Sequence, residues 1–231
     1  MALKLNSIAI SIPAYNEEKN IEEVIRNSVA VLSALTQNYE IVVINDGSTD
    51  NTKSVLEGLA KEIPQLKIFS HEKNLGIAET LKKVFLYPSK EWVFFIPGDG
   101  QIAPKEIYKL IPFTENYDYL IGKRAKRNDG FTRLLNAWIY NMVISVVALK
   151  RVTDIDSVVF YKRLFLNNTQ LYAKSAFIHA ELFIKARKNG ARSVEAEIEH
   201  LPRKFGKSTG SNPGVILKTA LDLLKLPFKP F

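Results

Sequence analysis

Short apolar runs and segments of helical periodicity alternate along the first half of the chain. The apolar runs cover residues 8–12, 40–44 and 92–96, and their length is typical of strands buried in a sheet. The first run leads into a segment where apolar residues recur at helical spacing, namely Ile21, Val24, Ile25, Val29 and Leu32. Repeated passages from strand to helix predict an α/β fold with a mostly parallel central sheet.

Each apolar run ends in a cluster of polar residues. Residues 13–17 read Pro-Ala-Tyr-Asn-Glu, residues 45–50 read Asn-Asp-Gly-Ser-Thr-Asp, and residues 97–101 read Pro-Gly-Asp-Gly-Gln. In open α/β sheets, ligands bind beyond the carboxyl ends of the strands. The three clusters are therefore predicted to lie near one another and to form a binding site.

The third cluster places a carboxylate, Asp99, two residues before an amide, Gln101. Oxygen ligands of this kind suit a hard divalent cation, Mg²⁺ or Mn²⁺, that keeps other positions for waters and a substrate diphosphate. Glycines that flank an aspartate after a strand also occur in ordinary turns. The two other clusters are what favour the metal-binding interpretation.

In order and spacing, the three clusters resemble the motifs of family 2 glycosyltransferases with a GT-A fold. The resemblance is strongest to the branch that contains dolichyl-phosphate mannose synthase and bacterial polyprenyl-phosphate glycosyltransferases, and it extends from Ile8 to about Leu226. It implies a single GT-A domain over residues 1–231, with a mixed, mostly parallel, Rossmann-like sheet flanked by helices. It also implies inverting transfer of a hexose from a UDP- or GDP-linked sugar to a polyprenyl phosphate.

The resemblance further implies roles for individual residues. The predicted nucleotide-sugar site consists of Pro13, Tyr15, Glu17, Asp46, Asp99, Gln101 and Arg203. Asp46 is expected to contact the base or ribose, and Asp99 and Gln101 to hold Mg²⁺ or Mn²⁺. The acceptor phosphate is assigned to Arg124, Arg133 and Ser208.

One position departs from the family pattern. The related synthases carry Asp-x-Asp-x-Gln, and this chain has Pro97 in place of the first aspartate. With one anionic ligand missing, we expect weaker metal binding or an ion held more by the phosphates of the donor. A metal-independent enzyme and a catalytically silent nucleotide-binding relative remain alternatives.

The predicted chemistry depends on the acceptor. Breaking the donor bond places negative charge on the diphosphate, which Asp99 with its cation and Arg203 would stabilise. A polyprenyl phosphate is already ionised at neutral pH, so it needs no catalytic base. A sugar hydroxyl would need one, and Glu181 is then the catalytic candidate, with Asp156 second. Glu181 also suits a purely structural position at the start of a helix.

The composition of the chain indicates which classes of partner it can bind. The chain has 32 Lys and Arg against 24 Asp and Glu, a net charge of +8, which favours anionic partners. No aromatic and basic platform for nucleic acid is recognisable, so we expect none to bind. The absence of cysteine excludes disulfides and thiolate metal sites. The start of the chain shows no cleavable signal pattern, so the expected location is cytoplasmic.

Residues 134–149 contain no charged side chain. The segment is too short and too polar to span a bilayer, which needs roughly 20 apolar residues. It fits either a core helix or a helix lying in the membrane interface; Trp138 and Tyr140, between Arg133 and Lys150, favour the second. We therefore predict membrane-surface helices at residues 133–150 and 215–231, and a peripheral protein on the inner face of the membrane.

Overall fold

The computed structural model describes residues 5–125, 131–205 and 222, without the side chains of residues 131–136. The strands of the described residues are β1 (Ile8–Ala14), β2 (Tyr39–Asn45), β3 (Leu66–Ser70), β4 (Trp92–Phe95), β5 (Tyr119–Arg124), β6 (Val158–Lys162) and β7 (Ser193–Ile198). The α-helices are α1 (Ile21–Leu35), α2 (Thr52–Glu62), α3 (Ile77–Leu86), α4 (Ile107–Leu110), α5 (Phe131–Val147) and α6 (Ile178–Lys188). Short 3₁₀ helices cover Pro104–Glu106, Ile111–Glu115 and Arg163–Leu166.

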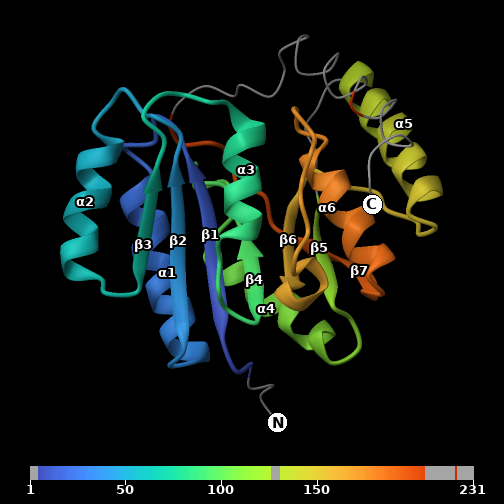
Figure 1. The fold of residues 1–231 in the computed structure, drawn as a ribbon, viewed down its shortest axis with the longest axis horizontal. Coiled ribbons are helices and arrows are strands. Elements are labelled where there is room, and N and C mark those ends of the chain that lie inside the picture. Colours follow the sequence, from blue (N-terminus) through green and yellow to red (C-terminus); the bar gives the residue numbers. More distant parts are fainter. Residues whose placement is uncertain (1–4, 126–130, 206–221, 223–231) are drawn as a thin grey trace.

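The strands form one sheet in the order β3-β2-β1-β4-β6-β5-β7 (Figure 1). Neighbouring strands are parallel except at β6, which is antiparallel to both β4 and β5. This confirms the predicted α/β fold with a mixed, mostly parallel sheet. The prediction of a single domain over residues 1–231 stays a prediction.

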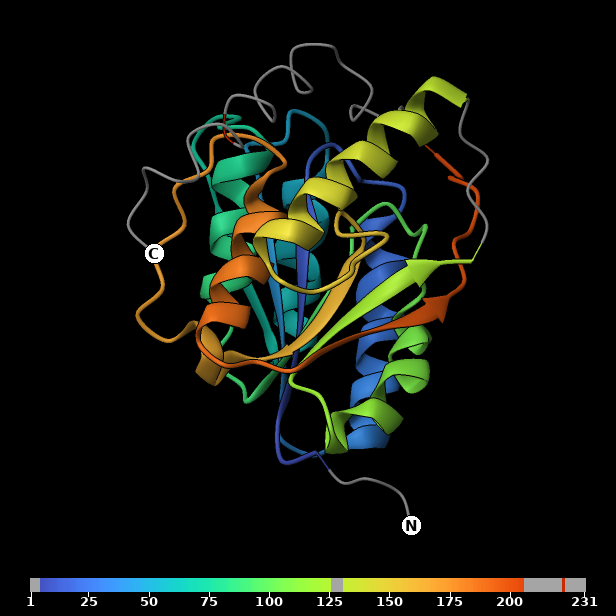
Figure 2. The ribbon, with the colours of Figure 1, turned by 90° about the vertical axis from the view of Figure 1, so that its right-hand side faces the viewer.

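Helices cover both faces of the sheet. Helices α1 and α4 lie on one face, and α3 and α6 lie on the other, while α5 lies outside this layer and crosses α6 (Figure 2). Because both faces are covered, Ile8, Ile10 and Val43 are fully buried, as are the alternate residues Ala9 and Val42. Burial on both faces explains why these strands appear in the sequence as continuous apolar runs.

The arrangement of β1, β2 and β4 positions the candidate site. These three strands are parallel neighbours, so their carboxyl ends lie at the same edge of the sheet. The loop after β4 packs directly on the end of β1, because a Cβ on Gly98 would lie 2.7 Å from the carbonyl oxygen of Pro13. Only glycine allows this approach, so the residues that follow Gly98 are brought beside those that follow β1.

Candidate active site

The loops after β1 and β2 form one hydrogen-bonded unit. The backbone N–H of Asn16 donates to Ser48 Oγ at 3.0 Å, and the side-chain oxygen of Asn16 accepts the N–H of Thr49 at 2.8 Å. The N–H of Glu17 donates to Thr52 Oγ1 at 2.8 Å. Asn16 has a φ of 55°, which asparagine tolerates better than most residues. The first two polar clusters of the sequence are therefore joined in space.

An arginine from the opposite end of the chain lies between two acids. Arg203 Nη2 is 2.5 Å from Glu17 Oε1 and 3.8 Å from Asp99 Oδ2. Glu17 follows β1, Asp99 follows β4, and Arg203 follows β7. The other carboxylate oxygen of Glu17 accepts a hydrogen bond from Asn20 at 2.6 Å. Three predicted donor-site residues are thus brought together.

The two acids make this a site that favours positive charge. Burial raises the pKa of Glu17 above its ordinary value, and the negative charge of Asp99 raises it further. The hydrogen bond from Asn20 and the charge of Arg203 act in the opposite direction. A cation near Glu17 and Asp99 therefore relieves their repulsion.

Gln101 fastens the loop after β4 to the segment that carries Arg203. Its backbone N–H donates to Asp99 Oδ1 at 3.0 Å, which turns that carboxylate back over its own loop. Its side-chain Nε2 donates to the carbonyl oxygen of Leu201 at 3.3 Å, and the N–H of Leu201 donates to the Gln101 carbonyl at 2.8 Å. These bonds place Leu201 beside Gln101 and help to bring Arg203 over the site.

Asp46 is buried at the end of β2 and holds the loop that follows β3. Its Oδ1 lies 2.8 Å from His71 Nδ1 and accepts the backbone N–H of Leu75 at 2.8 Å, and its Oδ2 accepts the N–H of Gly76 at 3.0 Å. The expected contact of Asp46 with a base or ribose stays a prediction. Nearby, Tyr15 is 41% exposed, so its ring is open to a ligand.

Arg124, at the end of β5, forms a two-pronged ion pair with Asp154. Its Nε donates to Asp154 Oδ2 at 2.8 Å, and its Nη2 donates to Oδ1 at 2.5 Å. Sequence reasoning missed Asp154 and considered the nearby Asp156, which is exposed. In the sequence, Asp154 is only a second acid in the same short loop, and no local pattern marks it as the partner of Arg124. The Arg133 side chain and Ser208, also predicted to bind phosphate, lie outside the described residues.

Glu181 is 1% exposed and holds a neighbouring segment of backbone. Its carboxylate accepts the N–H of Tyr172 at 2.9 Å and of Ala173 at 2.7 Å, and lies 3.3 Å from Lys185 Nζ. Within the described part of the chain, no hydrogen bond or ion pair joins Glu181 to Asp99 or Arg203. A role for Glu181 as a base stays a prediction.

The side chains around Asp99 fit part of the coordination shell of a divalent cation. Among the described residues, no group of three or more His, Asp or Glu side chains is placed to hold a metal ion. Mg²⁺ commonly uses one or two carboxylates and takes its other ligands from water and substrate phosphates. Asp99, with the amide of Gln101 two residues later, fits such a partial site.

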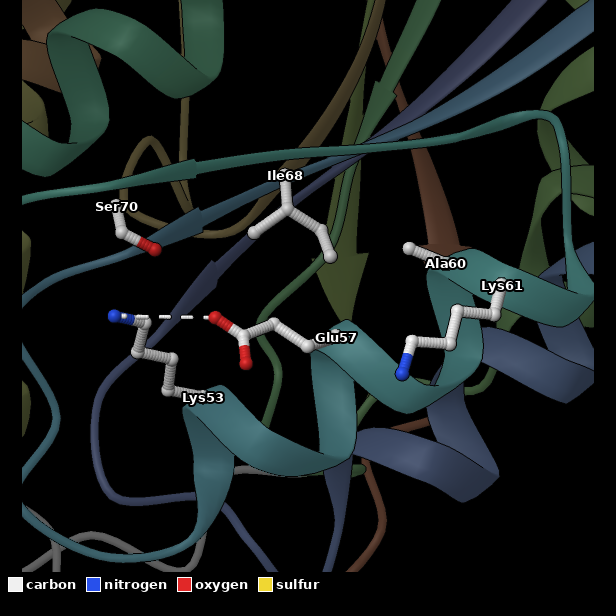
Figure 3. A pocket seen from close by; sticks show the side chains of 6 residues that line it. All are labelled: Lys53, Glu57, Ala60, Lys61, Ile68 and Ser70. Atoms are coloured by element: carbon white, nitrogen blue, oxygen red, sulfur yellow. Dashed lines mark ion pairs between the residues drawn. The ribbon is translucent and has the colours of Figure 1, made fainter.

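An open hollow of about 530 Å³ lies elsewhere, between α2 and the edge strand β3 (Figure 3). Its wall includes Lys53 and Glu57, which form an exposed ion pair at 3.8 Å. None of the predicted site residues lines it. The site is therefore defined by the convergence of strand ends and not by this hollow.

Comparison with known families and curated proteins identifies related sequences. The family model described as glycosyl transferase family 2 matches residues 9–183. An undecaprenyl-phosphate 4-deoxy-4-formamido-L-arabinose transferase from Yersinia enterocolitica is 30% identical over 210 residues, covering 89% of this chain and 63% of the relative. The chain thus spans a little under two thirds of the length of that relative.

Solved structures share the fold. The glucosyl-3-phosphoglycerate synthase of Mycobacterium tuberculosis, in complex with Mn²⁺, UDP and phosphoglyceric acid, superposes with a TM-score of 0.70 at 18% identity, over 96% of this chain and 78% of that chain. The same enzyme with Mg²⁺ and UDP gives a TM-score of 0.68 at 19% identity, over 96% and 79%. At such identities the similarity shows the fold.

Proposed function

The chain belongs to glycosyl transferase family 2, and from that premise we propose that it transfers a sugar, with inversion, from a nucleotide-diphosphate donor to a polyprenyl phosphate at a membrane surface. The observation that carries the proposal is the convergence of Glu17, Asp99 and Arg203 at the carboxyl ends of β1 and β4. The similarity to a transferase named for undecaprenyl phosphate supports the acceptor class.

On the donor side, the chain supplies positive charge where the diphosphate leaving group forms. Arg203 is held between two acids, so its guanidinium is oriented before a substrate arrives. Asp99 and Gln101 would hold Mg²⁺ or Mn²⁺, whose charge would stabilise the departing diphosphate. Glu17 provides a second carboxylate near Asp99, across Arg203, although Pro97 stands where the family has its first aspartate.

On the acceptor side, Arg124 is the described residue proposed to bind phosphate. Asp154 engages the Nε and Nη2 edge of its guanidinium and so orients the whole group, and an oriented guanidinium suits phosphate oxygens. The second ionisation of a phosphate monoester lies near pH ~6, so the nucleophile is an anion at neutral pH. The hydrogen bonds of Glu181 to backbone N–H groups are consistent with a reaction that needs no base.

Transfer to a short polyprenyl phosphate, measured with labelled donor sugars, tests the proposed function. We expect Glu181→Gln to retain activity within about tenfold, because glutamine keeps an oxygen that can accept the N–H groups of Tyr172 and Ala173. Loss of a true general base would lower the rate by roughly 10²–10⁴-fold. Asp156→Asn, at the other candidate base, is the parallel variant, and circular dichroism checks that both fold. A folded Glu181→Gln that is inactive, together with wild-type transfer to sugar hydroxyls, would replace this proposal by a hydroxyl acceptor.

Helix α5 supports the membrane part of the proposal. Its inner face buries Asn141 and Ile144, whereas Trp138 is 61% exposed and Val146 is 69% exposed. Leu149, just beyond the helix, is 87% exposed. An apolar face turned outward matches a helix that lies in the membrane interface. None of the helices described is long and apolar enough to cross a bilayer.

We expect Trp138→Glu to weaken sedimentation with anionic vesicles by about tenfold or more, because the new carboxylate cannot enter the interface. Tyr108→Glu is a matched control, since Tyr108 is an exposed aromatic residue on α4. The wild type and the control should sediment alike. Equal loss in both variants, or no vesicle binding by the wild type, would contradict an interfacial role for α5.

A further inference from the structure

The described part of helix α5 is hydrogen-bonded to the segment of residues 152–155. Ser145 Oγ accepts the N–H of Val152 at 2.9 Å, and it donates to the carbonyl of Asn141 at 2.6 Å or of Val152 at 3.1 Å. The side-chain oxygen of Asn141 accepts the N–H of Ile155 at 3.0 Å. Two polar side chains on the inner face of a mostly apolar helix therefore fix the start and the end of the 152–155 segment.

The same segment is held from the sheet by Glu195 of β7. Glu195 accepts the backbone N–H of Thr153 at 2.7 Å, the hydroxyl of Thr153 at 2.9 Å, and the N–H of Asp154 at 3.1 Å. Val152, Asp154 and Ile155 are all buried. With α5 on one side and β7 on the other, the backbone of the 152–155 segment has little freedom to shift by itself.

What this segment presents is Asp154, the partner of Arg124. Asp154 accepts the N–H, the Nε and the Nη2 of Arg124, so it sets both the direction and the rotation of the guanidinium. Arg124 ends β5 and has an 18% exposed side chain. Any displacement of the 152–155 segment moves Asp154, and with it the guanidinium that is proposed to meet the acceptor phosphate.

We propose that the seating of α5 positions Arg124 through the 152–155 segment, which makes Asn141, Ser145 and Asp154 positioning residues for the acceptor phosphate. This inference rests on the proposed function, in which Arg124 binds that phosphate and the outer face of α5 meets the membrane. Its consequence is that capture of the lipid phosphate depends on the helix that lies at the lipid surface, while binding of the nucleotide does not.

Isothermal titration with farnesyl phosphate, a short isoprenyl monophosphate, tests the inference without requiring turnover. Ser145→Ala removes the acceptor for the Val152 N–H and is expected to weaken binding about tenfold. Ser145→Thr keeps the hydroxyl and should restore the wild-type affinity. Affinity for whichever of UDP, GDP and dTDP binds the wild type should change less than about twofold in both variants.

Ser28→Ala is the matched control. Ser28 is buried in α1, and its Oγ donates to the carbonyl of Val24 at 2.7 Å, four residues earlier, as Ser145 donates to Asn141. It has no part in the 152–155 segment, so its removal should leave both affinities unchanged. Asn141→Leu, which removes the other contact of α5, is the second variant and should resemble Ser145→Ala.

A double-mutant cycle separates positioning from a general loss of stability. In an Arg124→Ala background, Ser145→Ala should weaken farnesyl phosphate binding no further, because the group that it positions is gone. Additive losses, or an unchanged affinity in Ser145→Ala and Asn141→Leu, would overturn the inference and leave the proposed function standing. A wild type that binds no farnesyl phosphate would overturn the proposed function and this inference together.

Discussion

Replacing Asp99 by asparagine is expected to lower sugar transfer by roughly a hundredfold or more. The neutral amide would bind the divalent cation less tightly, and the negative charge of the departing diphosphate would then be less well stabilised. The side chain keeps its size, and its oxygen can still accept the Gln101 N–H. The metal-dependent part of nucleotide diphosphate affinity should fall at least about tenfold, or ~1.4 kcal/mol. Titration of the nucleotide with and without Mn²⁺ measures this part directly.

Two variants complete this experiment. Asp118→Asn is a matched control for stability, because Asp118, like Asp99, is an acid paired with basic side chains, here Lys162 and Arg192, and it immediately precedes β5. It should leave the metal dependence intact. Pro97→Asp restores the family pattern and should tighten metal binding if the loop folds without its proline. Metal-dependent binding that is the same in Asp99→Asn and the wild type would contradict the assignment of Asp99.

Arg203→Gln is expected to reduce transfer by about 10²–10³-fold, because it removes the cation placed between Glu17 and Asp99. The adjacent Lys204 offers a matched comparison. Its ammonium pairs with Glu23 at 2.9 Å, with both side chains more than half exposed, and such pairs contribute about 0–1 kcal/mol. Initial rates should therefore change less than about threefold in Lys204→Gln.

Comparing Arg203→Gln with Lys204→Gln separates the effect of where the positive charge lies from the effect of net charge, because each variant removes one positive charge from the same segment. If both variants lose activity equally, net charge in this segment matters and the contact with Glu17 and Asp99 does not. If Arg203→Gln is nearly normal, the proposed leaving-group role is wrong. Thermal melts of both proteins show whether a loss comes from unfolding.

The convergence of the candidate donor-site residues was predictable because they follow strands with strong local signals. The apolar runs at residues 8–12, 40–44 and 92–96 became β1, β2 and β4, and the helical spacing after the first run became α1. Parallel neighbours bring their carboxyl ends to one edge, so a motif after each strand falls in one place. The acid pair of Glu17 and Asp99 follows from that rule.

The proposed acceptor side was harder to anticipate because its contacts join residues around an antiparallel strand inserted in the sheet. Strand β6 enters between β4 and β5, and this order depends on pairing energies that no local pattern carries. As a result, Asp154 lies against Arg124 across 30 positions of sequence. Of the two acids in that loop, burial distinguishes Asp154 from the exposed Asp156.

For Glu181 and helix α5, the sequence left two roles open each: a base or a structural acid for Glu181, and a core or an interfacial helix for α5. The structure adds the contacts and the burial of each. Glu181 starts a helix, as expected, but its carboxylate holds backbone N–H groups of Tyr172 and Ala173. Helix α5 is neither wholly buried nor wholly exposed, since Ile144 faces the protein and Trp138 faces outward. A broadly apolar helix can be covered on either face, and the elements that pack against it decide which. The periodicity of the helix itself does not show which elements these are.

By itself, the sequence determined the α/β fold and the parallel strands that end in polar clusters, and it predicted Asp99 and Gln101 as metal ligands, because each of these signals is encoded over a few adjacent positions. Only the tertiary structure decided that Arg203 bridges Glu17 and Asp99, 186 positions from Glu17, and that Asp154 orients Arg124. Ion pairs of this kind form where the chain is brought together by burial of its strands. The packing of the whole sheet and its loops decides which residues pair, because it brings together residues that are far apart in the sequence.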